Sequence, residues 1–235
     1  MKALYDTTEG SGHRIRGIRA AAHGWTLCAI LGVMMALSMV SCGGDDEEKL
    51  AELPANASGI DVERAEKDRF LKSDAQSPIP ADMRAAFAGL SYFPYEEKYV
   101  VIASFEPATK PDTVKIPASQ GEFRSMVRAG VFSFLFDNGE KVFTLTGYRQ
   151  AEGESKVVTI PFKDKTSGSS SYGAGRYLDI DEPGEECTLD FNKAYNPYCA
   201  YNEDYSCLLV PPQNVLTVAV MAGEKTYHAA TKGAR

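Results

Sequence analysis

The polar side chains that could bind a ligand or catalyse a reaction gather in one stretch, residues 162–207. It reads FKDKTSGSSSYGAGRYLDIDEPGEECTLDFNKAYNPYCAYNEDYSC and holds six tyrosines. An arginine beside carboxylates and amides can orient a planar polar ligand through charge-assisted, bidentate hydrogen bonds. Tyrosines add amphipathic contact area at little cost in rotamer entropy. We therefore expect a pocket for a small polar ligand, such as a glycan, a peptide or a metabolite, lined by Arg176, Asp190, Asn192, Tyr195, Asn196 and Asn202.

The same residues support a structural alternative. In β proteins, a buried arginine–aspartate pair and asparagines that bind loop backbone often close one end of a barrel. A hairpin over residues 175–192, turning near Pro183, would make Arg176 and Asp190 cross-strand neighbours. The loop over residues 192–207 would then cover their ion pair. A ligand pocket and a clamp remain alternatives, because the sequence does not tell which of these atoms are exposed.

A hydrolase is the other function considered, with Asp164 or Asp190 as the acid/base and Arg176 as the charge stabiliser. The histidine in the C-terminal part of the chain, His228, lies in a polar tail and is a poor platform for a catalytic base. The cysteines lack partner histidines at metal-ligand spacing, and the glycine-rich residues 168–176 lack the Lys-Ser/Thr ending of a phosphate loop. We therefore expect no metal and no cofactor, and a binding or structural module rather than an enzyme.

Residues 1–41 resemble an export signal. A basic region precedes the apolar run of residues 25–40, which is 16 residues long and so shorter than the ~20 that span a bilayer. The sequence MVSC at residues 39–42 is similar to a bacterial lipobox, whose cysteine is acylated and becomes the mature N-terminus. We expect acylation of Cys42 and an outer-membrane lipoprotein of the cell envelope, on the periplasmic face or at the cell surface. Secretion after cleavage elsewhere is the alternative.

An acidic stretch follows the lipobox. Residues 42–58 have no apolar periodicity and predict a flexible tether, and their Gly-Gly-Asp-Asp-Glu-Glu segment also resembles a signal that directs some lipoproteins to the cell surface. Loss of residues 1–41 leaves 21 Lys and Arg against 30 Asp and Glu, a formal charge of −9. Such a chain, without a basic stripe, is a poor candidate for nucleic-acid binding. The expected partners are the membrane, through the lipid anchor, and the small ligand.

Three cysteines remain after Cys42. An oxidising compartment favours disulfide formation. Cys199 and Cys207 are the natural pair, because the loop between the neighbouring strands can fold back on itself. Closing so short a loop contributes ~2–3 kcal/mol in the chain-entropy description. Cys187 would then be a spare, buried thiol.

One domain is expected after the tether. Residues 59–228 are numerous enough to form a core, and residues 229–235 are predicted to be a disordered tail. Apolar residues lie on one helical face of residues 59–72, which predicts a short N-terminal helix.

The rest of the domain has the pattern of an all-β protein. From residue 98 onward the apolar period is two, in about eight short runs with turn signals between them. The Asn-Gly pair at residues 138–139 predicts a hairpin over residues 131–148, and residues 214–225 predict the last strand. We therefore expect a single antiparallel barrel or sandwich.

The segments FKDKTSGSSSYGAGRYLD, LDFNKAYNPYCAYN and CLLVPPQN resemble the bacterial family of unknown function DUF1684, and the similarity extends over residues 62–225. The resemblance implies a compact, mostly β domain without an established activity. This chain departs from the family pattern at Ser170 and Ser171, where Glu-Thr is usual, and at Gln213, where Glu is usual. A reaction that depended on either family glutamate would be impaired in this chain.

Overall fold

The computed structural model describes residues 58–228, except residues 111, 137–138 and 154. The predicted signal peptide, Cys42, the tether up to residue 57 and the tail of residues 229–235 lie outside the described residues. Within the described part of the chain, no helix is long and apolar enough to cross a membrane.

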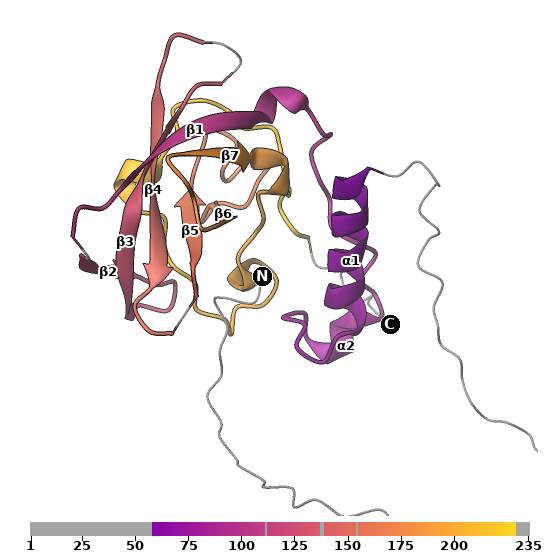
Figure 1. The fold of residues 1–235 in the computed structure, drawn as a ribbon. Coiled ribbons are helices and arrows are strands. Elements are labelled where there is room, and N and C mark those ends of the chain that lie inside the picture. The colour runs from indigo at the N-terminus through magenta and orange to yellow at the C-terminus, as the bar shows by residue number, and fades with distance from the viewer. Residues whose placement is uncertain (1–57, 111, 137–138, 154, 229–235) are drawn as a thin grey trace, which may run out of the picture. The chain divides into compact units, whose positions relative to one another are not determined.

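Seven strands form one antiparallel sheet (Figure 1). They are β1 Val100–Pro107, β2 Thr113–Pro117, β3 Phe123–Phe134, β4 Phe143–Gln150, β5 Val157–Phe162, β6 Arg176–Asp181 and β7 Glu186–Asp190. The strand order is β6-β5-β4-β3-β1-β7. The long strand β3 pairs with β2 through its first half and with β1 through its second half. Because the end strands β6 and β7 also come into contact, the sheet curls into a nearly closed barrel, which confirms the predicted mainly β antiparallel fold.

The helical elements are few and short. They are α1 Gly59–Ser73, α2 Ala81–Arg84 and the 3₁₀ turns η1 Glu97–Tyr99, η2 Phe191–Lys193, η3 Tyr198–Ala200 and η4 Pro212–Asn214. At the start of α1, the backbone N–H of Ser58 donates to Asp61 Oδ2 at 3.2 Å, which satisfies a backbone group that the helix leaves free. The predicted N-terminal helix is thus confirmed.

An aromatic cluster forms the centre of the core. Neighbouring ring centroids within it lie 5.1–6.1 Å apart, in tilted, stacked and edge-on arrangements, and the rings belong to Phe134, Phe136, Phe143, Phe162 and Phe191. Burial of such rings is the main driving force for folding a domain of this size. Apolar side chains of β1, β3, β4 and β5 that lie on one face of the sheet belong to the same core cluster.

One of the two predicted hairpins is present in the structure, and the other is not. The hairpin of residues 131–148 is present, since Val131 on β3 pairs with Thr146 on β4; its turn residues 137–138 lie outside the described residues. The predicted hairpin over residues 175–192 is wrong, because β6 pairs with β5 and β7 pairs with β1. Strands that follow each other in the chain therefore lie at opposite ends of the sheet order. The chain does turn between β6 and β7, as predicted, but a turn does not decide which ladder each strand joins.

The predicted last strand, residues 214–225, is wrong, because this segment begins at the end of η4 and joins no ladder. Its alternation is real, since Asn214, Leu216 and Val220 are buried and the residues next to them are more exposed. Its backbone makes only isolated bridges, at Val215 and Glu224. Loop backbone supplies some of its other hydrogen-bond partners, since the Glu224 N–H donates to the Ala194 carbonyl at 2.9 Å. Side chains from elsewhere supply further partners, and these side chains form the centre of the site described next.

Candidate functional site

Arg176, the first residue of β6, is buried in the interior. Its side chain is 1% exposed, and Nη2 lies 3.2 Å from Oδ2 of Asp164, a side chain that is 0% exposed. Nη2 also donates to the carbonyl oxygen of Val220 at 2.9 Å, and Nη1 donates to those of Ala222 and Glu224. All these acceptors belong to the chain itself. The guanidinium therefore attaches β6 to the C-terminal segment.

Asp164 holds the same segment from its other side. Its Oδ2 accepts a hydrogen bond from the backbone N–H of Val220 at 2.6 Å, and its Oδ1 accepts from Thr166 Oγ1 at 2.7 Å. Burial lowers the pKa of Arg176, and the carboxylates of Asp164 and Glu224 partly offset this effect. We call the Arg176–Asp164 pair and the backbone of residues 220–224 the arginine clamp.

A second buried ion pair lies beside the arginine clamp. Lys67 of α1 binds Glu224 Oε1, and their side chains are 6% and 1% exposed. The other carboxylate oxygen of Glu224 accepts from the Asn196 N–H at 2.9 Å and from the Tyr201 hydroxyl at 2.6 Å. Burial and the neighbouring Glu224 raise the pKa of Tyr201 well above its ordinary value, so the phenol remains a donor. Helix α1 is thereby attached to the C-terminal segment.

Neither Lys67 nor Glu224 was among the predicted site residues. A signal for Lys67 existed, because it lies at helical spacing from the buried Ile60 and Leu71 and so on the buried face of α1. For Glu224 the sequence holds only a charged residue in an extended, alternating segment. Its partners come from more than 20 positions away, and no local pattern connects them.

Asp190 and Asn192 hold a turn rather than a ligand. Asp190 Oδ1 accepts from the backbone N–H of Asn192 at 3.0 Å and from its Nδ2 at 2.9 Å. The Asn192 amide also binds Glu96 through both its oxygen and its nitrogen, each at 3.1 Å. Asp190 pairs with Val100 across β7 and β1, so the predicted Arg176–Asp190 ion pair is wrong, and Asp164 is the partner of Arg176.

The other predicted residues also bind the chain itself. The Tyr195 hydroxyl donates to Asp179 Oδ2 at 2.8 Å, and Asn196 Nδ2 donates to the Lys225 carbonyl at 2.8 Å. Asn202 Oδ1 accepts from the N–H of Asp204 at 2.9 Å, in a separate turn. Asn196 Oδ1 is buried without a hydrogen-bond partner within the described part of the chain. A bidentate site needs two free polar atoms side by side, so Asn196 Oδ1 alone does not form one.

This geometry favours the clamp over the two alternatives. Asp164 is fully buried against Arg176, so its carboxylate is not placed to exchange protons with a substrate. Asp190 is partly buried, and its Oδ1 is engaged by Asn192. Neither lines either of the two surface hollows described below. The part of the chain that the structure describes also holds no cluster of three or more His, Cys, Asp or Glu that could bind a metal ion.

Cys199 and Cys207 are free thiols, so the expected disulfide is not present in the structure. The two residues are nevertheless neighbours, because the Cys199 N–H donates to Cys207 Sγ at 3.1 Å. Backbone and side-chain bonds already fix the loop without a covalent bridge: Ser119 N–H donates to the Cys207 carbonyl at 2.9 Å, and Cys207 N–H donates to Ser119 Oγ at 3.0 Å. Cys187 is also free, and it is only partly buried.

A surface groove lies between β2 and the segment after Cys207. We call it the β2 groove; it has a volume of about 340 Å³ and is lined by residues 114–117, Arg128, Tyr148 and residues 209–213. The Tyr148 hydroxyl accepts from Gln213 Nε2 at 2.8 Å and so joins the two walls. Sequence reasoning missed this groove, because its walls come from four separate segments.

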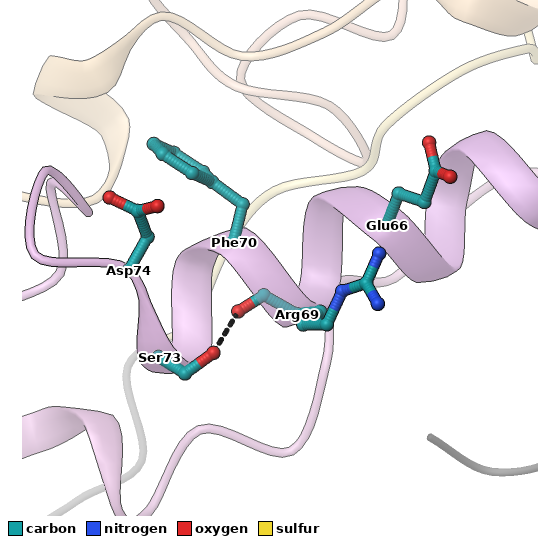
Figure 2. Close-up of a pocket in the computed structure, with 5 residues that line it drawn as sticks. All are labelled: Glu66, Arg69, Phe70, Ser73 and Asp74. Carbon is teal, nitrogen blue, oxygen red and sulfur yellow. Dashed lines mark hydrogen bonds between the residues drawn. The ribbon is translucent and has the colours of Figure 1, made fainter. Parts of the chain in front are cut away.

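A second hollow, of about 330 Å³, lies along α1. Figure 2 shows its lining residues Glu66, Arg69, Phe70, Ser73 and Asp74, with Ser73 Oγ donating to the Arg69 carbonyl at 2.8 Å. All five come from one helix and its C-cap, and their side chains point in different directions. Ligand sites usually have polar groups that converge from several elements, so this hollow is a poor candidate.

The fold and these contacts define a mainly β, barrel-like domain that is closed by buried ion pairs. The chain belongs to the family described as "Protein of unknown function (DUF1684)", which matches residues 85–225. Its structure is similar to the solution NMR structure of the uncharacterized protein from gene locus rrnAC0354 of Haloarcula marismortui. That comparison has a TM-score of 0.57 and 40% sequence identity, and it covers 71% of this chain and 92% of the other. Among curated proteins, no relative matches the chain.

Proposed function

We propose that this chain is a lipid-anchored binding module of the cell envelope. The anchor is supported by the basic region, the 16-residue apolar run and the lipobox-like MVSC that ends at Cys42. The acidic residues 43–58 then serve as the tether between the lipid and the domain. The location that follows is the outer membrane, on its periplasmic face or at the cell surface.

The β2 groove is the proposed ligand site, and its cationic lining is the observation that carries the proposal. The residues first expected to bind a ligand have their hydrogen bonds inside the fold, whereas the β2 groove opens to solvent. Its volume of about 340 Å³ lies within the range of small-molecule sites. Its lining includes two cations, Lys115 and Arg128, and no Asp or Glu. The lining of the β2 groove is thus positively charged, although the whole chain has a formal charge of −7.

The lining indicates the chemistry of the ligand. Val114, Val210 and the two prolines at residues 211–212 provide apolar wall. Arg128 has an exposed ion pair with Asp112 at 3.6 Å, which leaves most of its donors available. A guanidinium beside an apolar wall complements a carboxylate attached to an apolar body. We therefore propose a small apolar carboxylate as the ligand class.

The ligand proposal is tested with phenylacetate, using the uncharged phenylacetamide as the matched probe. We expect phenylacetate to shift the amide NMR signals of residues 114–117 and 209–213. Arg128→Ala should weaken binding about tenfold, because a charge-assisted hydrogen bond is lost. Arg69→Ala, at an exposed arginine of α1, is the control and should bind like the wild type. Equal binding of both probes, or shifts outside the β2 groove, would leave the domain a structural module.

The anchor proposal is tested separately. A Cys42→Ala chain should lose incorporation of labelled fatty acid and move from the membrane fraction to the soluble fraction. Continued acylation, or unchanged fractionation without it, would contradict the lipid anchor. The outcome does not depend on the phenylacetate experiment, so the two parts of the proposal can fail independently.

A further inference from the structure

Cys199, in the 3₁₀ turn η3, lies beside Tyr172 and Cys207. The Tyr172 hydroxyl donates to Cys199 Sγ at 3.8 Å. The Cys199 N–H in turn donates to Cys207 Sγ at 3.1 Å. Cys199 is partly exposed, whereas Cys207 is 4% exposed. Cys199 is therefore the more exposed residue of the pair.

The surroundings favour the thiolate of Cys199. The hydrogen bonds from Cys207, Tyr172 and Ser119 lower its pKa to about 7, against an opposing effect of burial. Burial alone raises the pKa of Cys187, which has no such donors. Burial and the charges of Cys199, Cys207 and Glu203 raise the pKa of Tyr172, so the phenol keeps the proton with which it donates. A stabilised and accessible thiolate is the property that reactive cysteines share.

We propose that Cys199 and Cys207 form a peroxide-reactive thiol pair, in which Cys199 is the attacking sulfur and Cys207 the resolving sulfur. The co-reactant is a hydroperoxide. This activity goes beyond the proposed binding function and does not depend on it. It also assigns a role to two free thiols that lie together in a loop where no covalent bridge is needed for the fold.

The reaction has two steps. The Cys199 thiolate attacks one oxygen of the hydroperoxide; an S–O bond forms, the O–O bond breaks, and the leaving hydroxide or alkoxide takes a proton from water. Sulfur loses two electrons and the peroxide gains them. The Cys207 thiol then loses its proton and attacks the sulfenic acid; an S–S bond forms and the S–O bond breaks, with release of water. Together, two thiols and one hydroperoxide give one disulfide, one alcohol or water, and one water.

The first experiment measures alkylation of the reduced full chain by iodoacetamide across pH, with the label assigned to each cysteine by peptide mass spectrometry. The rate at Cys199 should have a midpoint near pH 7. At pH 7 the larger thiolate fraction raises the rate ~15-fold over an ordinary thiol and the weaker nucleophile lowers it ~5-fold, so a net gain of about threefold is expected. Tyr172→Phe and Cys207→Ala should move the midpoint upward. Cys187→Ala is the control and should leave it unchanged.

The second experiment adds hydrogen peroxide to the reduced full chain. The wild type should lose two hydrogens and link the peptides of Cys199 and Cys207. The Cys207→Ala variant should instead hold a sulfenic acid at Cys199 that dimedone traps. A midpoint for Cys199 at the ordinary thiol value, or oxidation of Cys199 no faster than that of Cys187, would overturn the proposal. Tyr172→Phe removes only a hydroxyl, so the pH test remains decisive even if Cys207→Ala does not fold.

Discussion

Two arginines of this domain have opposite surroundings. Arg176 in the arginine clamp is 1% exposed, and its bonds go to Asp164 and to backbone carbonyls of the same chain. Arg128 in the β2 groove has a side chain that is 43% exposed, with a single ion pair at 3.6 Å. The first arginine is therefore bound within the fold, whereas the second is partly exposed to solvent.

The comparison extends to the carboxylates and thiols around these arginines. Glu224 and Asp164 are buried beside cations and donors, so their charges stabilise the fold. Cys199 lies on a partly exposed loop, where hydrogen bonds lower its pKa to about 7. We infer that polar residues of similar type differ in their roles according to whether solvent can reach them. The four predictions that follow test this distinction.

The largest effect is expected at the arginine clamp. Arg176→Ala leaves Asp164 buried without a counter-charge, which typically lowers the free energy of unfolding by ~3–5 kcal/mol. Arg128→Ala, the matched change in the β2 groove, should lower it by less than about 1 kcal/mol. Urea denaturation followed by circular dichroism measures both. If both variants lost a similar free energy of unfolding, the arginine clamp would stabilise the fold no more than the β2 groove does.

A glycine within the arginine clamp provides the second test. Gly223 has a φ of +74°, and a Cβ there would lie 2.4 Å from the Ala194 carbonyl oxygen. Gly223→Ala should therefore lower the free energy of unfolding by ~2–4 kcal/mol, from left-handed strain together with crowding. Gly121 has a φ of +95° with nothing within 4 Å of its Cβ position, so Gly121→Ala isolates the strain alone. If Gly121→Ala proved as harmful in denaturation, the close packing of the clamp segment would not be the cause.

The third test removes one charge from the Lys67–Glu224 pair. Glu224→Gln keeps the size of the side chain but leaves Lys67 buried without its counter-charge. Because the carbonyl oxygen of the new glutamine can still accept from Lys67, we expect a smaller loss than for Arg176→Ala, ~1.5–3 kcal/mol in the free energy of unfolding, the range for hydrogen bonds to charged groups. Glu63→Gln, which opposes Lys193 in an exposed pair at 2.7 Å, is the control and should change stability little. Thermal unfolding of both variants in the same buffer measures the two losses. Equal losses would contradict the prediction.

The smallest effect is expected at Asp68, which is partly exposed on α1. Burial, with a contribution from Glu224, raises its pKa, and its hydrogen bond from the Leu90 N–H only partly opposes this. A raised pKa in the folded state means that the stabilisation is complete at acid pH and is lost as pH rises through that value. Asp68→Asn lacks this loss, so its melting temperature relative to wild type should increase from pH 3 to pH 7. The same difference at both pH values would show that Asp68 is effectively in solvent.

Much of the fold was predictable because its signals are local. The helical spacing of Ile60 and Leu71 predicted α1, and the alternation around residues 131–148 predicted the β3–β4 hairpin. The alternation of residues 214–225 is present in the burial pattern, but the strand predicted from it is wrong. The segment joins no ladder, because its partners are the side chains of Arg176 and Asp164 and the backbone of loop residues such as Ala194.

The candidate site was less predictable. The residues predicted to line a ligand pocket do form side-chain hydrogen bonds, but their partners are other residues of the domain. Asn192 binds Glu96, and Asn196 binds Lys225. The residues of the β2 groove gave no signal, since Lys115, Arg128 and residues 209–213 are far apart in the chain. Side-chain type indicated where polar bonds form but not whether the partner is solvent, ligand or protein.

By itself, the sequence determined the mainly β class of the domain, its N-terminal helix and its family. These depend on composition and on periods of two and 3.6 residues, which short segments express without help from the rest of the chain. Only the tertiary structure decided that Arg176 pairs with Asp164 rather than Asp190, and that Cys199 and Cys207 meet as thiols. Those outcomes depend on which strand edges meet when the sheet curls. Burial, the quantity that separates a clamp from a site, exists only after that closure.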